Sequence, residues 1–188
     1  MDHVVEHLST AALEAGLDVI RQSPADNGRV ELIVRRPAVD ERDVLDEGEL
    51  DTTVGLVGDT WSVRGSSRTP DGAAHPEMQL NVINARLAAL VAGALDRRAL
   101  AGDQLHVDLD LSSRNLPPGT RLELGTAVIE ITAQPHTGCK KFAARFGQDA
   151  WRFVNSPVGR ELNLRGVNAK VVVPGSVRAG DVIRKLPT

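Results

Sequence analysis

The sequence is poor in cysteine and in aromatic residues. Its 188 residues include one cysteine, three phenylalanines, two tryptophans and no tyrosine. A single cysteine cannot form an internal disulfide, so we expect a reducing compartment, the cytoplasm. A chain of this length can bury an apolar core without disulfides. The scarcity of aromatic rings argues against a surface that stacks nucleic-acid bases.

Long apolar runs and an excess of basic charge are also absent. No run of about 18 apolar residues occurs, which argues against a membrane span. The first residues, MDHVVEHLSTAALEAGL, lack the basic and apolar regions of a signal peptide. The formal net charge is −3, with acids and bases interleaved, whereas nucleic-acid-binding proteins usually present a basic face. The expected partner is therefore a small molecule or another protein.

Hydrophobic periodicity predicts many short strands. Residues 105–111 alternate, with Leu105, Val107, Leu109 and Leu111 on one face. A strand is predicted over 30–36, two more within 116–134, and two within 168–186 around a Pro-Gly turn. The acidic segment 37–51 is expected to be an irregular, solvated loop.

Two segments have helical periodicity. The first twenty residues read as one amphipathic helix, with apolar side chains that include Val4, Leu8, Leu13 and Leu17. Residues 79–100 are expected to begin as a strand and continue as a helix capped by Asn84. In that helix the residues expected to face inward are Leu87, Leu90, Val91 and Leu95.

Short strands, Gly/Pro turns and interposed helices predict the fold class. We expect a mainly β protein, a β-barrel with several peripheral α-helices. No internal repeat or low-complexity segment occurs. We therefore expect one domain over residues 1–188, with a helical N-terminal extension over 1–29 and the barrel core over 30–188.

The only cysteine lies in PHTGCKKFAARFG, residues 135–147. Residues 140–146 fit a short helix, and Thr137 is a predicted N-cap, which would place Cys139 in the first helical turn. A helix N-terminus and nearby positive charge both favour a thiolate. That charge is expected from His136, Lys140, Lys141 and Arg145. Lone cysteines usually pack in cores, but glycine and lysine neighbours do not make a core, so we expect a reactive or ligating role.

Lys140 and Lys141 have the wrong sign for the dipole of a helix that begins beside them. An anion bound at that position would reverse the effect, and a phosphate-bearing ligand beside a thiolate would explain the arrangement. The alternative is that both lysines point into water and are screened. Their charge does not separate these two interpretations.

Several segments together resemble the MOSC domain. This module forms the C-terminal part of molybdenum-cofactor sulfurases and also occurs as small stand-alone bacterial proteins. The resemblance spans about 30–186 and is strongest from Leu105 onward. It is carried by LPPGTRLELGTAVIEITAQ, PHTGCKKFAARFG and VNSPVGRELNLRGVNAKVVVPGSVRAGDVI, and GLVGDTW is similar to an earlier glycine-rich segment of the family. The specific core is a strand, a lone cysteine followed by basic residues, and a closing G-x-V-x-x-G-D element.

The resemblance implies a barrel of the MOSC type, like that of pyruvate kinase, and an association with the molybdenum cofactor, molybdopterin. It implies that Cys139 is the family's functional cysteine, which either carries sulfur as a persulfide or, as in the amidoxime-reducing members, ligates molybdenum. Thiolate sulfur suits both roles. The phosphate of the cofactor gives Lys140, Lys141 or Arg145 a partner, with Thr137 beside them.

Two residues of LRGVNAK are also expected to contribute to the site. Arg165 and Asn168 precede a predicted strand, where they could reach the mouth of a pocket. Their alternative roles are a surface charge for Arg165 and a turn residue for Asn168.

Two departures from the family pattern limit what the resemblance implies. Many stand-alone members have an HGG segment before the central helix, whereas this chain has GAAHPEMQLN, and His75 is assigned no role. The sulfurases also contain a pyridoxal-phosphate domain, for which this chain has no room. Any sulfur would therefore come from another protein, such as a cysteine desulfurase.

The sequence supports three functional hypotheses. The first is a sulfur carrier, a sulfur transferase that uses Cys139 as the persulfide site. The second is the cofactor-binding component of a reductase of N-hydroxylated compounds, with Cys139 as the molybdenum ligand. It needs a redox partner protein, because no flavin, haem or iron–sulfur motif occurs in the sequence. The third is a non-catalytic binding module in which Cys139 is structural.

Overall fold

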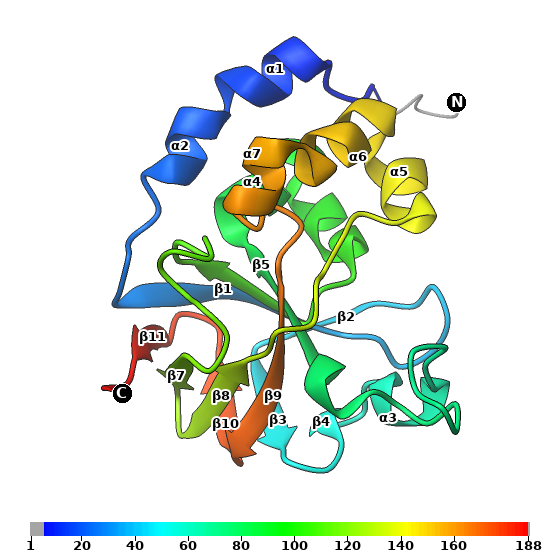
Figure 1. The fold of residues 1–188 in the computed structure, drawn as a ribbon, viewed down its shortest axis with the longest axis vertical. Helices are drawn as coiled ribbons and strands as arrows, with labels where there is room; N and C mark the ends of the chain where they lie inside the picture. The colour runs from blue at the N-terminus through cyan, green and yellow to red at the C-terminus, as the bar shows by residue number, and fades with distance from the viewer. Residues whose placement is uncertain (1–5, 188) are drawn as a thin grey trace.

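The computed structural model describes residues 6–187. Seven strands form a closed barrel (Figure 1). In chain order they are β1 (Gly28–Arg35), β5 (Leu80–Asn84), β6 (Leu105–Asp108), β7 (Arg121–Leu124), β8 (Ala127–Ile131), β9 (Val167–Val173) and β11 (Val182–Lys185). Around the barrel the order is β1, β11, β7, β8, β9, β5, β6 and back to β1. The predicted barrel with helices around it is confirmed.

The pairing of β1 with β11 closes the barrel. Gly28 pairs with Ile183 and Arg29 with Val182, in antiparallel orientation. All other neighbours around the barrel are antiparallel too, except β5 and β6, which run parallel. A Cβ atom on Gly28 would lie 2.1 Å from the Asp108 carbonyl oxygen. Glycine is therefore required where β1 meets β6.

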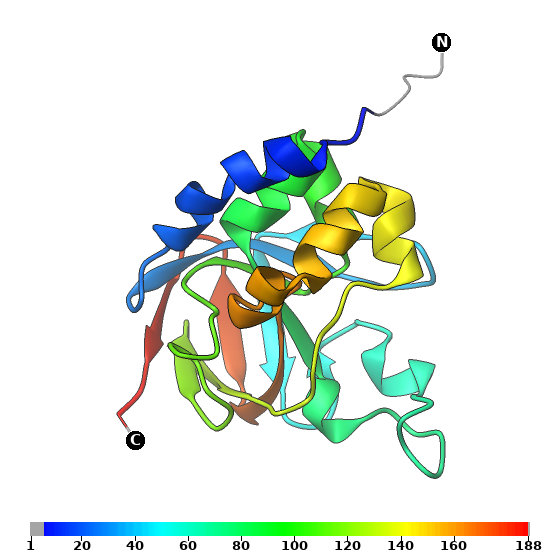
Figure 2. The ribbon, with the colours of Figure 1, turned by 45° about the horizontal axis from the view of Figure 1, so that its top comes forward.

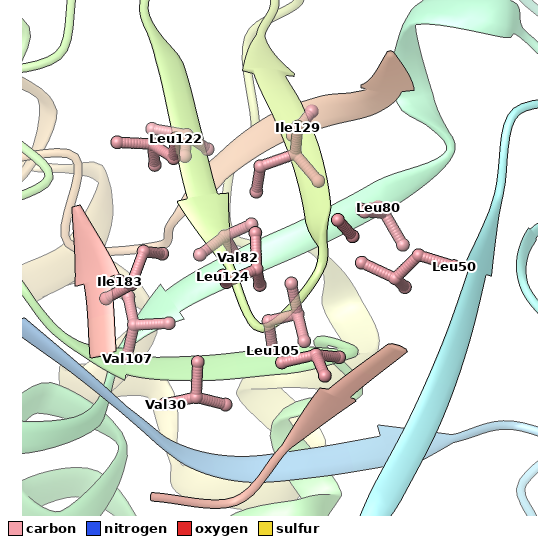
Figure 3. Packing of buried hydrophobic residues seen from close by; sticks show 14 of the residues in the cluster. Val30, Leu50, Leu80, Val82, Leu105, Val107, Leu122, Leu124, Ile129 and Ile183 are labelled. Carbon is pink, nitrogen blue, oxygen red and sulfur yellow. The ribbon is translucent and has the colours of Figure 1, made fainter. Parts of the chain in front are cut away.

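Alternating aliphatic side chains fill the barrel (Figure 3). Strand residues alternate between the two faces of a sheet, so every second residue points inward. Each fully buried aliphatic side chain contributes about 1.5–3 kcal/mol relative to exposure. The inward residues with no exposed surface include Val30, Leu80, Val82, Leu105, Val107, Leu122, Leu124, Ile129 and Ile183.

Most of the helices gather at one end of the barrel (Figures 1 and 2). They are α1 (Thr10–Ala15), α2 (Leu17–Arg21), α4 (Ala85–Ala92), the 3-10 helix η2 (Leu95–Ala101), α5 (Lys140–Phe146), α6 (Gln148–Asn155) and α7 (Pro157–Glu161). They enclose a second apolar cluster that includes Leu13, Leu87 and Phe146. Among residues 6–187, no helix is both long and apolar enough to cross a membrane.

The helix predictions were right in part. Asn84 caps α4 as predicted, because its side-chain oxygen accepts hydrogen bonds from the Arg86 and Leu87 amides. The helix ends at Ala92, since Gly93 has a φ of 70°. Leu95 therefore lies beyond the helix and is 72% exposed. The prediction that it faces inward from this helix is wrong.

The single N-terminal helix is also a wrong prediction. Ser9 caps α1, and a new helix, α2, begins at Leu17 after Gly16. Leu13 is buried in the helix cluster, whereas Leu8 is exposed. Val4 lies outside the described residues.

The acidic segment 37–51 contains two strands, which corrects the predicted irregular loop. β2 (Asp43–Leu45) pairs with β1. β3 (Glu47–Asp51) lies between β4 (Gly55–Leu56) and β10 (Gly175–Arg178) in a three-stranded sheet. Acidic residues of β3 alternate with inward residues, of which Leu50 joins the barrel core. Because β10 forms here, residues 168–186 contain three strands, one more than predicted.

Two short helices, α3 (Trp61–Arg64) and η1 (Pro76–Met78), precede β5.

Candidate functional site

Cys139 stands at the junction between an extended segment and α5. It is the N-cap residue of that seven-residue helix, with φ −105° and ψ 175°, and its side chain makes no capping hydrogen bond. The thiol is free and the residue is exposed. The prediction that Thr137 caps the helix and that Cys139 lies in its first turn is therefore wrong.

Contacts of Gly138 explain why the helix starts late. The Gly138 amide donates to Asn155 Oδ1 over 3.0 Å, and its carbonyl oxygen accepts from Trp151 Nε1 over 2.9 Å. A Cβ at this position would lie 2.7 Å from Asn155 Nδ2. Helix α6 therefore holds the chain extended up to Cys139.

A cavity of about 310 Å³ opens beside Cys139; we call it the Cys139 cavity. Its walls come from the loop after β1, from α3, from the start of β5, from the end of η2, from residues 136–145 and from Arg165, just before β9. One acidic side chain lines it, that of Asp40. The cationic lining residues are six: Arg36, Arg42, Arg64, Lys141, Arg145 and Arg165.

The cavity brings together most of the residues expected at the site. Thr137, Cys139, Lys141, Arg145 and Arg165 line it. Lys140 is exposed and is not among its lining residues. That these side chains bind a cofactor stays a prediction.

Asn168 is buried beneath the cavity and does not line it. Its Oδ1 accepts from Asn81 Nδ2 over 2.7 Å, and its Nδ2 donates to the Gln134 carbonyl oxygen over 3.0 Å. Asn81 itself lines the cavity. Asn168 therefore positions a lining residue and ties β9 to the segment that leads to Cys139.

Arg36 is held in the cavity wall by a buried carboxylate. Its Nε and Nη2 donate to the two oxygens of Asp59 over 2.8 and 2.7 Å, and its Nη1 donates to the Gly102 carbonyl oxygen over 3.2 Å. Burial alone raises the pKa of Asp59, but the hydrogen bonds and charge of Arg36, with the Trp61 amide, outweigh it, so this pKa lies below its ordinary value. The pair is ionised at neutral pH.

Arg165 is fixed in a similar way and is not the surface charge that the alternative interpretation of the sequence allowed. Its Nη1 donates to Asp103 Oδ1 and Oδ2 over 2.8 and 2.7 Å. Its Nη2 donates to the Ala101 carbonyl oxygen, and its guanidinium carbon lies 5.0 Å from the centre of the Phe142 ring. Complete burial raises the pKa of Asp103, and Arg165 opposes that rise. The guanidinium therefore has a defined position beneath α5.

His136 does not supply the positive charge expected from the sequence. Burial lowers its pKa well below the ordinary value, and the charges of Arg165 and Arg36 act in the same direction. Its Nδ1 lies 3.6 Å from Asp103 Oδ1 and has no hydrogen-bond partner among residues 6–187. The imidazole is neutral at pH 7, and the positive charge near Cys139 comes from arginine and lysine.

Two of the lining arginines form no ion pair within the described part of the chain, Arg42 and Arg64. Burial, followed by neighbouring arginines, lowers the pKa of both. The Nε of Arg42 is buried without a hydrogen-bond partner among those residues. A buried donor of this kind is costly unless a ligand or water satisfies it. The cavity is therefore suited to an anion.

Sequence reasoning missed half of the cationic wall. Arg36 ends a predicted strand and Arg42 belongs to the predicted solvated loop, while Arg64 follows GLVGDTW in a segment to which no site residue was assigned. The sequence signal that could have pointed to this wall was the segment GLVGDTW, because its Asp59 pairs with Arg36. His75 caps η1, where its Nδ1 accepts from the Glu77 amide, and it does not line the cavity.

Known proteins resemble the chain in sequence and in fold. The family model described as the MOSC domain matches residues 70–184. YuaD from Bacillus subtilis is 19% identical with a TM-score of 0.58, and the match covers 84% of this chain and 94% of YuaD. YiiM from Escherichia coli is 21% identical with a TM-score of 0.54, and the match covers 85% of this chain and 70% of that one.

A second YiiM, from Geobacillus stearothermophilus, is 11% identical with a TM-score of 0.52, and the match covers 87% and 74% of the two chains. No curated protein sequence matches this chain. The structural matches agree with the barrel, and the family model covers more than half of the 188 residues. The chain belongs to the MOSC domain family, which is associated with the molybdenum cofactor.

Proposed function

We propose that the Cys139 cavity binds the phosphate-bearing molybdenum cofactor and that the Cys139 thiolate is the protein's ligand to molybdenum. The observation that carries this proposal is the exposed thiol at a cavity lined by six cationic side chains and one acidic side chain. The chain would then be the cofactor-binding component of a reductase, and N-hydroxylated compounds are the substrate class.

The residues present fit such a group. Thiolate sulfur is a soft ligand suited to molybdenum–sulfur chemistry. The unpartnered Nε of Arg42 is a donor for a phosphate or other anionic oxygen. Arg36 and Arg165 keep their places through buried carboxylates, so neither side chain has to be ordered when an anion enters.

The protein's part in the reaction is to bind and to orient. When bound, the cofactor supplies two-electron redox chemistry at molybdenum. Lys141 and Arg145 would hold anionic oxygens from α5, and Arg42, which lies beside Arg145 over Gly102, would do so from the loop between β1 and β2. The given residues include no flavin, haem or iron–sulfur motif, so the proposal includes a redox partner protein as the source of electrons.

The exposure of Cys139 also favours a second function, sulfur transfer. A partner protein could reach an exposed thiol. The Cys139 thiolate would attack the outer sulfur of a donor persulfide, such as that of a cysteine desulfurase. The donor sulfur–sulfur bond would break, the donor would leave as a thiolate, and Cys139 would carry the persulfide.

Metal analysis separates the two functions. Protein purified without oxygen from a host that makes the cofactor should contain about one molybdenum per chain, and Cys139→Ala should contain almost none. Because Cys139 is exposed, the variant should keep its fold, which circular dichroism can verify. Lys140→Ala, in the next residue but outside the cavity, serves as the matched control and should keep the metal.

Intact mass resolves the remaining outcomes. Molybdenum retained by Cys139→Ala would show that the thiol is not the ligand. The sulfur-carrier function would be favoured if no sample contained molybdenum and the wild type, but not Cys139→Ala, were heavier by about one sulfur atom. Neither cargo in any sample would contradict both functions.

A further inference from the structure

We propose that the Asp40 carboxylate competes with the ligand's phosphate for the same two cations, Lys141 and Arg145. A phosphomonoester takes the position that this carboxylate occupies. The Asp40 side chain must therefore rotate away before the ligand binds. This rests on the proposed function in that the Cys139 cavity is the ligand site. It goes further by naming the phosphate position and the residue that controls entry to it.

The contact joins two distant parts of the chain across the cavity. Asp40 Oδ1 lies 3.0 Å from Arg145 Nη2 and 3.5 Å from Lys141 Nζ. Asp40 belongs to the loop between β1 and β2, whereas both cations belong to α5. A carboxylate oxygen already lies where these two cations meet, so the position accepts an anionic oxygen.

A third cation, Arg42, lies beside Arg145 over Gly102. A Cβ on Gly102 would lie 3.3 Å from Arg42 Nη2 and 3.6 Å from Arg145 Nη1, so the two guanidinium groups share the space above this residue. With a φ of 81°, Gly102 also has a backbone conformation that side chains disfavour. Arg42 has no ion pair within residues 6–187. These three cations form one cluster, in which the Asp40 carboxylate contacts two, Lys141 and Arg145.

A phosphate matches this cluster better than a carboxylate does. A phosphomonoester carries about −1.5 to −2 charges at pH 7 and three acceptor oxygens. The carboxylate of Asp40 carries one charge and has two oxygens, of which Oδ1 makes both contacts. Charge-assisted hydrogen bonds from arginine to phosphate are strong and directional. The ligand therefore outcompetes Asp40 once it reaches the cluster.

Asp40 can leave without disturbing the cations. Its side chain is 64% exposed, and exposed ion pairs are weak. Arg145 keeps a second anchor, since its Nη1 donates to the Leu100 carbonyl oxygen over 2.9 Å. Asp40 itself has a φ of 61°, a conformation that few non-glycine residues adopt. The loop thus gives up a weak contact, while the phosphate position stays formed.

Calorimetric titration of the full chain with inorganic phosphate tests the proposal. Asp40→Asn should bind phosphate about two- to fivefold more tightly than the wild type, because the competing carboxylate is gone. Glu41→Gln removes the same charge from the next residue, whose side chain forms no ion pair in the described chain. This control should change the affinity less than about twofold.

A double-mutant cycle supplies the second readout. In an Arg145→Ala background, Asp40→Asn should improve phosphate binding by less than about twofold, because the shared cation is gone. Equal effects of Asp40→Asn and Glu41→Gln would overturn the proposal, since net charge alone would then explain both. Lack of phosphate binding by both the wild type and Asp40→Asn would also overturn it.

The outcome is independent of the metal analysis. If Asp40→Asn gives the expected gain while no sample contains molybdenum, the phosphate position stands and molybdenum ligation fails. If molybdenum loading depends on Cys139 while Asp40→Asn leaves phosphate affinity unchanged, molybdenum ligation stands and the role of Asp40 as a competitor fails.

Discussion

Replacing Asp59 with alanine should lower the free energy of unfolding by about 3–5 kcal/mol. The Asp59 carboxylate has no exposed surface and the Arg36 side chain is only 7% exposed. Removing the carboxylate leaves a guanidinium buried with its Nε and Nη2 unpaired. The Trp61 amide, which donates to Asp59 Oδ1 over 2.9 Å, loses its acceptor as well. Urea denaturation followed by circular dichroism measures the difference.

A matched control is the ion pair of Arg35, the last residue of β1 and the neighbour of Arg36 in sequence. Arg35 pairs with Asp43, but there the two side chains are 35% and 42% exposed. Asp43→Ala should therefore cost less than about 1 kcal/mol. If Asp59→Ala cost no more than Asp43→Ala, the Arg36–Asp59 pair would not be a major stabilising contact, and the defined position of Arg36 in the cavity wall would lose its basis.

Acidification from pH 7.5 to pH 5.0 should lower the free energy of unfolding by about 2 kcal/mol through His106 alone. His106 lies on β6, is 1% exposed, and has no hydrogen-bond partner for either ring nitrogen within residues 6–187. Burial, helped by the charge of Arg165, lowers its pKa to about 4. His136, whose pKa is also lowered, adds an effect of the same sign.

The sign follows from the proton balance. A histidine in the unfolded chain titrates near pH 6.5, so below that pH the unfolded state binds protons that the folded state does not. The contribution of His106 is complete above about pH 6.5, declines as the pH falls, and is exhausted below the folded pKa of about 4. Carboxylates with lowered pKa values, such as Asp59, act mainly below this range.

His106→Leu isolates the contribution of this residue. Leucine has a similar volume and forfeits no side-chain hydrogen bond, so the variant should fold. Its stability should depend less on pH, by about 2 kcal/mol between pH 7.5 and pH 5.0. Identical pH profiles for the variant and the wild type would mean that folding does not lower the pKa of His106.

The barrel was predictable because strand signals are local. The alternation from Leu105 to Leu111 indicates one buried face whatever lies opposite. The strand β3 was missed since its glutamates and aspartate suggested a solvated loop, although Leu50 points into the barrel core. The buried face of β3, which includes Leu50, determines that this segment forms a strand, whereas the acidic composition reflects only its exposed face.

The site was less predictable, because its chemistry depends on contacts between distant segments. Cys139, Lys141 and Arg145 are neighbours in sequence and were found together. Arg36 and Arg42 reach the same cavity from the loop after β1, about a hundred residues away in sequence. The pairing of Arg36 with Asp59 is visible only after folding. The neutrality of His136 likewise depends on burial by residues that no local pattern identifies.

The pairing of β11 with β1 has a consequence for how the protein is made. Ile183, the barrel partner of Gly28, is synthesised about 155 residues after it. Until then β1 lacks one neighbour and presents an unpaired edge, a state prone to aggregation. Contacts between residues so far apart in sequence also form slowly. Nascent chains should therefore need protection until β11 emerges, when the barrel can close in one late step.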